Sequence, residues 1–226
     1  MAVEYTAELV RSVEQGADTR SLHLRQTTGP RIAFRPGQFI SCLLPIGGET
    51  LIRPYSLTSD PEDEDLEICL NLVPGGRGSR YLLGLPVGAT VRFTGPWGTF
   101  TLDQAPEGEV VFIADGTGIA PIRPMLHRAL ATTPRHSIRL LCGIWPDSGL
   151  PYHAELVVLA REHSALDFDA VPSTALRDEV RRRWVDGDVE RRRSFYICGV
   201  GQLVPELRDL LRRTGYERRA VQYEKW

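Results

Sequence analysis

The stretch that most constrains this fold runs from Val110 to Leu126 and reads VVFIADGTGIAPIRPML. Its apolar start, without polar alternation, is typical of a parallel strand covered on both faces. Glycines follow at once, and a helix opens at Pro121. A glycine turn before a helix gathers backbone N–H groups and the positive end of the helix dipole, which together favour an anion such as a phosphate. The stretch therefore indicates a nucleotide site. A purely structural turn is the alternative, because Ala120 and Pro121 depart from the G-x-G-x-x-G pattern.

Beyond residue 108, apolar runs alternate with helix-length segments. The expected strands cover 110–114, 138–142, 166–171, 194–198 and 219–223, and the expected helices cover 121–131, 153–163, 174–184 and 204–214. Strands separated by helices indicate right-handed βαβ units and a parallel sheet. Such sheets bind ligands at the carboxyl ends of their strands, which is where the glycine turn lies.

The first hundred residues consist of short alternating runs broken by glycine and proline. These runs cover 5–13, 19–25, 38–44, 51–58, 66–73 and 90–95. Strands at this spacing indicate an antiparallel barrel, here with one short helix at 80–85 and a solvated hairpin tip at 60–65. We therefore expect two domains: an antiparallel β-barrel over residues 1–104 and a parallel α/β domain over residues 108–226, with the linker within 103–109.

The composition is that of an ordinary soluble globular chain of 226 residues, of which 42% are hydrophobic. No apolar run approaches the roughly 20 residues that span a bilayer, so no membrane span is expected. Glutamates near the start of the chain argue against a signal peptide, which makes a cytoplasmic location the expectation. The net charge is −2, and neither half of the chain is basic enough to bind nucleic acid.

Cysteine and histidine show no metal-binding pattern. The cysteines lie at least 27 residues apart inside apolar segments, at Cys42, Cys69, Cys142 and Cys198. Neither a zinc site nor an iron–sulfur cluster has this spacing, and no metal is expected. Surface positions on helices or in loops are expected for His127, His136, His153 and His163.

A strand near residue 55 carries three side chains suited to a ligand that has a diphosphate and a flat ring. Arg53 can clamp a diphosphate, Tyr55 can stack on a flat ring, and Ser56 can donate a hydrogen bond to a ring nitrogen. Pro54 lies between them. Ordinary strand residues are the alternative interpretation of this motif.

Three more motifs are rich in glycine. The segment from Gly76 to Ser79 precedes a helix and offers an anion site with Ser79 as the capping residue, or simply an ordinary helix start. The segment Gly95 to Gly98 is expected to be a turn unless Trp97 lines a pocket. The segment Cys198 to Gly201 follows an expected strand, where a doubly wound sheet presents ligand contacts.

In chain order, RPYS, GGRGS, GPWG, GTGIAP and CG resemble the motifs of the ferredoxin–NADP+ reductase family of flavoproteins. The resemblance runs from about Phe34 to Trp226. It implies that the barrel holds FAD, with FMN as the alternative, and that the α/β domain holds NADH or NADPH. It also implies that hydride passes from nicotinamide C4 to flavin N5, after which single electrons leave for a separate ferredoxin, flavodoxin or oxygenase component.

The same resemblance implies a role for particular residues. The flavin would contact Arg53, Pro54, Tyr55, Ser56, Gly76, Gly78, Ser79 and the ring of Trp226. The nicotinamide nucleotide would contact Gly116, Thr117, Gly118, Asp147, Cys198 and Gly199. Ser56 and Cys198 would be the catalytic residues, because they flank the two rings between which hydride passes. An aromatic C-terminus that stacks on the cofactor favours FAD over FMN.

The nucleotide loops depart from the pattern of NADP-using members. Asp115 stands where glycine is more common and would place a carboxylate near the nucleotide. Asp147 suits a ribose 2′-hydroxyl, whereas a 2′-phosphate prefers a guanidinium. We therefore expect NADH to be preferred to NADPH, although Arg177 is close enough in sequence to serve a 2′-phosphate.

Two arginine groups, 181–183 and 191–193, flank an acidic turn. Solvated helix ends are the simplest interpretation, and steering of an acidic ferredoxin-like partner is the alternative. Two other functions stay open at this point. One is a flavin reductase that serves free flavin, and the other is a non-catalytic electron-transfer subunit of a larger complex.

Overall fold

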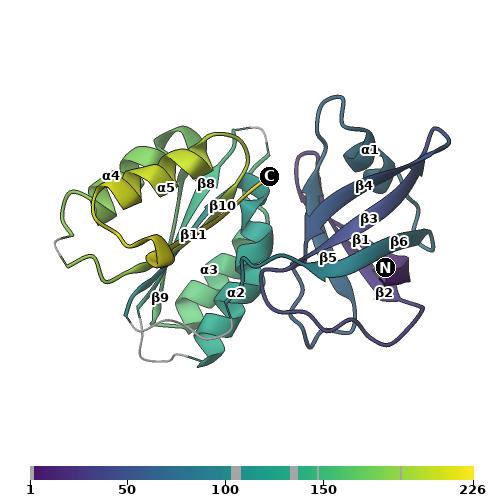
Figure 1. The fold of residues 1–226 in the computed structure, drawn as a ribbon, viewed down its shortest axis with the longest axis horizontal. Coiled ribbons are helices and arrows are strands. Elements are labelled where there is room, and N and C mark those ends of the chain that lie inside the picture. Colours follow the sequence, from purple (N-terminus) through teal and green to yellow (C-terminus); the bar gives the residue numbers. More distant parts are fainter. Residues whose placement is uncertain (1–2, 103–107, 133–136, 147, 189) are drawn as a thin grey trace.

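The computed structural model describes residues 3–102, 108–132, 137–146, 148–188 and 190–226. These residues form a β domain and an α/β domain that lie side by side (Figure 1). The expected fold class is confirmed, since an antiparallel six-stranded sheet precedes a five-stranded parallel sheet. Asp147 and most of the expected linker, residues 103–107, lie outside the described residues.

The β domain is a sheet curled around one apolar core. Its elements are β1 (Glu4–Gly16), β2 (Thr19–Gln26), β3 (Phe39–Ile46), β4 (Glu49–Ser56), β5 (Leu66–Asn71), α1 (Arg77–Leu83) and β6 (Thr90–Trp97). The strand order is β4-β3-β6-β1-β2-β5, and a single bridge between Leu57 and Ile68 joins the two edge strands. Alternating side chains such as Leu22, Leu24, Ile40 and Phe93 fill the interior.

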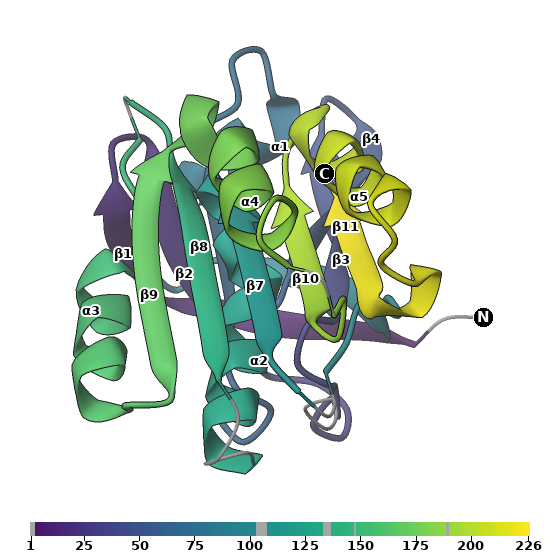
Figure 2. The ribbon, with the colours of Figure 1, turned by 90° about the vertical axis from the view of Figure 1, so that its left-hand side faces the viewer.

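The α/β domain places helices on both faces of the parallel sheet β11-β10-β7-β8-β9 (Figure 2). The strands are β7 (Val110–Asp115), β8 (Ile138–Ile144), β9 (Leu166–Pro172), β10 (Ser194–Gly199) and β11 (Val221–Lys225). The helices are α2 (Ile119–Thr132), α3 (His153–Glu162), α4 (Leu176–Trp184) and α5 (Leu203–Arg213). Short 3₁₀ turns η1 (Gly116–Gly118), η2 (Ser173–Ala175) and η3 (Arg218–Ala220) complete the domain.

Successive residues of β7 belong to different cores, as expected for a strand buried on both faces. Phe112 and Ala114 pack with α2 and α3 on the face toward the β domain, whereas Val111 and Ile113 pack with α4 and α5 on the outer face. Among the described residues, the helices are too short or too polar to cross a bilayer.

Two local predictions are wrong. The segment from Gly95 to Trp97 is the end of β6 rather than a turn: Trp97 pairs with Phe39, and the register shifts between Phe39 and Ser41. Glycine and proline fit such an irregularity as well as they fit a turn, because both interrupt a regular ladder. The helix α1 also begins earlier than expected, directly after Gly76.

Arg123 of α2 and Tyr152, which directly precedes α3, fasten the two domains together. The Arg123 guanidinium donates to the carbonyl of Thr58 at 2.5 Å and to Glu155 at 2.8 Å, and it lies 3.3 Å from Glu67. Tyr152 donates its hydroxyl hydrogen to Glu67 at 2.9 Å. Each of these contacts except that with Glu155 crosses from one domain to the other, so the domains meet through a buried polar network.

His127 belongs to this network, and the expectation of a simple surface histidine is wrong. Its Nδ1 lies 2.8 Å from Asp60 of the β domain, and its Nε2 lies 2.9 Å from Glu155 of α3. Burial lowers the pKa of His127, but the hydrogen bonds to Asp60 and Glu155 outweigh that effect and raise the pKa to about 9. An imidazole can donate to two carboxylates only when both nitrogens carry hydrogen.

Candidate functional site

The strand β4 brings the first predicted motif to the edge of the sheet. Ser56 is 6% exposed, and its Oγ has no hydrogen-bond partner among the residues that the structure describes. Burial raises the pKa of Tyr55, so its hydroxyl stays neutral. The exposed Arg53 donates from Nη1 to the carbonyl of Ile52 at 2.8 Å. The motif therefore holds a buried, unused hydroxyl beside a ring and a guanidinium.

The start of α1 lies against this motif. A Cβ added at Gly78 would lie 2.9 Å from Cγ of Arg53 and 3.4 Å from the Tyr55 hydroxyl oxygen. The close approach explains why glycine is needed there. The structure thus brings Gly78 next to Arg53 and Tyr55, whereas the atoms nearest an added Cβ at Gly76 belong to Ser79 and Val73.

Ser79 is buried but does not cap α1, so that part of the prediction is wrong. Its hydroxyl accepts from the N–H of Val73 at 3.1 Å and donates to the carbonyl of Gly76 at 3.4 Å. It therefore ties the preceding loop to the helix, because the residue at the cap position is Gly76, which has no side chain to accept from the helix.

The C-terminus of the chain returns to the β domain. The Trp226 ring meets the edge of Phe39 in a T-shaped contact, with ring centroids 5.5 Å apart. Its backbone N–H donates to the carbonyl of Gly199 at 3.1 Å. Since Phe39 pairs with Ser56 across the β3–β4 ladder, Trp226 lies within one residue of the flavin motif.

The glycine turn after β7 packs directly on the end of β10. A Cβ added at Gly118 would lie 2.1 Å from the carbonyl oxygen of Cys198, so no larger residue fits. Gly116 has a φ of 56°, in the left-handed region that favours glycine. Thr117, between them, is part of the 3₁₀ turn η1. The predicted nucleotide residues Gly116 to Gly118 and Cys198 to Gly199 are therefore neighbours.

Cys198 is a buried, neutral thiol, because burial holds its pKa well above the ordinary value. Its neighbour in register on β11 is Glu224. Burial raises the pKa of Glu224 to about 7, and its Oε2 has no hydrogen-bond partner in the described part of the chain. Glu224 belongs to none of the motifs that the sequence offers. Only the β10–β11 register, which spacing along the chain does not reveal, identifies it.

Glu224 and Ser56 converge on the same place. A Cβ added at Gly98 would lie 3.0 Å from the Phe39 ring and 3.9 Å from Glu224 Oε1. Phe39 in turn is the register partner of Ser56. Two buried polar groups with unused hydrogen-bonding capacity thus flank one aromatic ring where the domains meet.

Asp115 is buried directly before the glycine turn, and its carboxylate is already hydrogen-bonded within the domain. It is 3% exposed, and its Oδ1 accepts a hydrogen bond from Trp145 Nε1 at 3.1 Å. Burial raises the pKa of Asp115, and hydrogen bonds from Ser173 and Trp145 partly offset that rise.

Arg177 and the two arginine groups are already engaged by carboxylates. Arg177 lies 3.9 Å from Glu206 across the α4–α5 contact. Arg183 pairs with Asp169 and Glu179, and Arg193 pairs with Asp188 and Glu109. Much of the positive charge that was considered for partner steering is therefore neutralised within the domain.

Comparison with known proteins connects this arrangement to a family. Residues 6–102 match the family model of the oxidoreductase FAD-binding domain, and residues 112–209 match that of the oxidoreductase NAD-binding domain. The reductase subunit of an aromatic O-demethylase from Amycolatopsis sp. (strain ATCC 39116 / 75iv2) is 30% identical over 236 residues, which cover 99% of this chain and 69% of that protein. The chain belongs to the ferredoxin–NADP+ reductase family.

Other similar proteins agree with this assignment. The ferredoxin–NADP reductase B of Sorangium cellulosum (strain So ce56) is 29% identical over 240 residues, covering 100% of this chain and 98% of that protein. The crystal structure of the Amycolatopsis cytochrome P450 reductase GcoB superposes with a TM-score of 0.83 at 28% identity, covering 99% of this chain and 69% of that one. The protein is thus a flavoprotein reductase that uses FAD and a nicotinamide nucleotide.

The residues present fit a flavin. The Ser56 hydroxyl is buried with an unused donor, and Gly78 lets the start of α1 approach Arg53 so closely that an added Cβ would lie 2.9 Å from Arg53 Cγ. The Ser56 hydroxyl suits a hydrogen-bonding ring, and the Arg53 guanidinium suits a phosphate; a flavin nucleotide has both. The individual contacts of each residue stay predictions.

Proposed function

We propose that this reductase takes hydride from NADH or NADPH onto FAD and passes electrons to a separate ferredoxin or oxygenase component. The proposal rests on two residues that lie near the Phe39 ring. Ser56, the register partner of Phe39, belongs to the predicted flavin motif. Glu224, which lies near the same ring at Gly98, is the register partner of Cys198 in the predicted nucleotide site. One aromatic ring therefore joins the flavin side of the site to the nicotinamide side.

The proposed flavin contacts are those predicted from the sequence, from Arg53 to Ser56, from Gly76 to Ser79, and at Trp226. The proposed nucleotide contacts are Gly116 to Gly118, Asp147, and Cys198 with Gly199. A bound flavin supplies the conversion of a two-electron hydride donor into single-electron transfers.

The protein's own task is to position and shield the reacting rings. Ser56 would donate its hydroxyl hydrogen to the flavin ring, and the Trp226 indole would cover it. The neutral thiol of Cys198 presents a compact, uncharged surface to the nicotinamide, because burial keeps it protonated. Such groups contribute by orientation and exclusion of water rather than by acid–base chemistry.

The nature of the acceptor follows from relatives. One relative is named as the reductase subunit of an aromatic O-demethylase. A relative from Ralstonia sp, 28% identical over 94% of this chain and 67% of its own length, is named as the ferredoxin–NAD(P)+ reductase component of naphthalene 1,2-dioxygenase/salicylate 5-hydroxylase systems. We propose a protein acceptor of this kind, domain boundaries at 1–104 and 108–226, and a cytoplasmic location, which the four free cysteines favour.

Stopped-flow spectroscopy tests the proposal. The purified protein is loaded with FAD or FMN, and the bleaching of the flavin absorbance is followed with NADH and NADPH in parallel. We expect rapid bleaching with FAD and a slower rate in Ser56→Ala, with Ser12→Ala on β1 as the matched control. A protein that retains no flavin, or whose flavin neither nucleotide reduces, would contradict the proposal. Faster turnover with free FMN than with any ferredoxin would favour a flavin reductase instead.

A further inference from the structure

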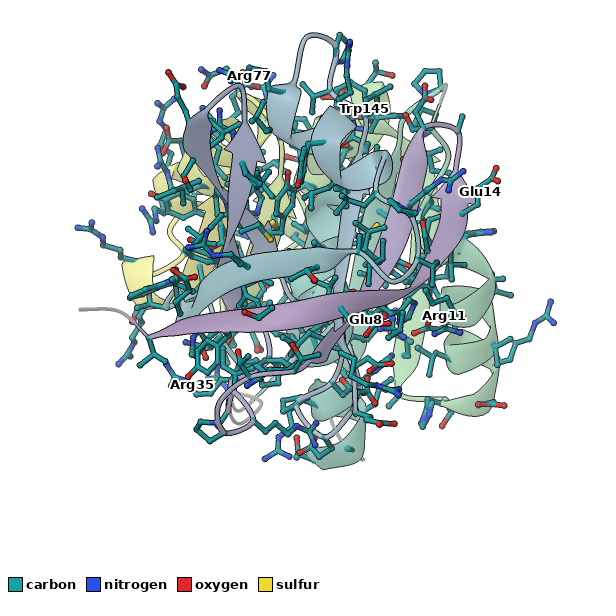
Figure 3. The ribbon with its side chains drawn as sticks, turned by 90° about the vertical axis from the view of Figure 1, so that its right-hand side faces the viewer. Glu8, Arg11, Glu14, Arg35, Arg77 and Trp145 are labelled. Atoms are coloured by element: carbon teal, nitrogen blue, oxygen red, sulfur yellow. The ribbon has the colours of Figure 1, made fainter. Side chains whose placement is uncertain are left out.

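The Trp145 indole lies directly over the glycine turn. Its Cδ1 and Nε1 would be 3.0 Å and 3.1 Å from a Cβ added at Gly116. Trp145 follows the end of β8, and its backbone is fixed by a bridge to Gly149. The side chain is nevertheless 45% exposed. Figure 3 shows it near the upper rim of the molecule, in the same half of the view as Arg77 at the start of α1. One edge of the ring is anchored, and much of the rest faces solvent.

Asp115 is the anchor. Its Oδ1 accepts from Trp145 Nε1 at 3.1 Å, and its carboxylate also accepts a hydrogen bond from Ser173. The Asp115 side chain packs against the backbones of two glycines, in space that a larger residue at either position would take. A Cβ at Gly143 would lie 2.5 Å from Asp115 Oδ1, and a Cβ at Gly199 would lie 2.8 Å from Asp115 Cβ. Asp115 is thus a fixed acceptor beneath the ring.

The order of the sheet shows which half of a dinucleotide would meet this ring. The strand β10, which carries Cys198, lies on one side of β7, and β8, which leads to Trp145, lies on the other. If the diphosphate sits over the turn after β7 and the nicotinamide reaches toward Cys198, the remaining half of the molecule must extend over β8. That half is the adenosine.

We propose that the Trp145 indole is the wall against which the adenosine half of NADH packs, and that Asp115 is the positioning residue that holds this wall. The inference rests on the proposed function for the direction of the nicotinamide. An aromatic ring that is rigidly held loses little entropy on contact with a flat base, and base–aromatic stacking is sequence-tolerant and strong enough to change affinity markedly.

The test compares ligands that contain adenosine with one that lacks it. The FAD-loaded full chain is titrated with ADP-ribose and NAD+ by calorimetry. Trp145→Ala should raise both dissociation constants about tenfold, since stacking is worth about 1–3 kcal/mol per base. The second-order rate constant for flavin bleaching by reduced nicotinamide mononucleotide, which has no adenosine, should not change. Trp145→Phe keeps a ring and should lose less than Trp145→Ala.

Variants of Asp115 show whether its hydrogen bond to the Trp145 indole or its negative charge matters for nucleotide binding. Asp115→Ala should weaken ADP-ribose binding nearly as much as Trp145→Ala, and combining the two changes should add little. Asp115→Asn keeps an acceptor oxygen and should restore most of the affinity. This rescue also keeps the inference testable if Asp115→Ala fails to fold.

Three results would overturn the inference. The first is unchanged ADP-ribose affinity in Trp145→Ala, and the second is tighter binding, which would make the indole a barrier. The third is an equal loss for reduced nicotinamide mononucleotide, which would place the ring on the nicotinamide side. A wild-type protein whose flavin no nucleotide reduces would instead contradict the proposed function, while the ADP-ribose titration would still decide the role of Trp145.

Discussion

Cys198 and Glu224 occupy the same register position on the adjacent parallel strands β10 and β11, and a buried carboxyl oxygen therefore lies beside a buried thiol. Neither group gains from ionising there, because burial raises the pKa of both. This pair of side chains is thus polar but uncharged below pH 7.

Glu224→Gln should remove a pH-dependent loss of stability. The folded-state pKa of about 7 is above the ordinary value of 4.5, so the stability linked to the protonated carboxyl is fully present below pH 4.5 and is lost as the pH rises through 7. We expect the variant and the wild type to have the same Tm at pH 4.5. At pH 8 the variant should have the higher Tm, with an unfolding free energy larger by on the order of 1–3 kcal/mol. Equal Tm differences at both pH values would contradict this pKa.

His127→Gln should show how much the histidine stabilises the domain contact. Its folded-state pKa of about 9 exceeds the ordinary 6.5, so the imidazolium contributes fully below pH 6.5 and its contribution is lost as the pH rises through 9. Wild-type Tm should fall across this window, and the variant should be less stable at pH 6 but closer to wild type at pH 9.5. Asp60→Asn should reduce the same pH dependence, and a wild-type Tm that is flat between pH 6.5 and 9 would refute the assignment.

Gly118→Ala should weaken nucleotide binding but should not reduce the amount of bound FAD. The new methyl group would lie 2.1 Å from the Cys198 carbonyl oxygen, and the backbone must shift to accept it. We expect a loss of about 1–3 kcal/mol in unfolding free energy and weaker ADP-ribose binding, with normal FAD content. Gly187→Ala is the matched control, since a Cβ there meets no described atom within 4 Å. Unaltered nucleotide affinity in Gly118→Ala would show that the turn tolerates the shift.

Glu206→Gln should improve the use of NADPH. The Glu206 carboxylate lies 3.9 Å from the Arg177 guanidinium. Arg177 belongs to the first turn of α4, directly after η2. The pair is exposed and therefore weak, so releasing the guanidinium should raise kcat/KM for NADPH only about two- to fivefold and leave NADH unchanged. Adding Arg177→Ala should abolish the gain. A rise for both nucleotides alike would mean that the pair does not act on a 2′-phosphate.

Most of the fold could be predicted because the burial of a strand on one face or on both faces determines the pattern of neighbouring residues in the sequence. The alternation in β2 and β3 and the unbroken apolar run in β7 follow from one-sided and two-sided burial, and both can be read from neighbouring residues. The glycine turn after β7 also lies where expected, since the close approach of its backbone to β10 excludes larger residues.

The relationships that the sequence did not reveal depend on distant partners. Asp115 looks like a ligand-facing carboxylate until Trp145, thirty positions away, is seen to donate to it. His127 looks exposed on its helix because the β-domain residue that meets it, Asp60, belongs to a loop that was expected to be only a solvated tip. The surroundings of Asp115 and His127 are set by strand register and by the contact between the domains. Neither produces a periodic pattern in the sequence.

Pro54 has a consequence beyond the flavin motif. It lies on β4, which pairs along its length only with β3 and meets β5 through the single bridge after its end. Long unpaired strand edges invite pairing with other chains, and Ile52 makes this edge more adhesive because its side chain is exposed. A proline within a strand turns its nitrogen away from the ladder and gives an incoming strand no N–H to bind. We therefore expect Pro54 to hinder the addition of a strand from another chain at this edge of the sheet.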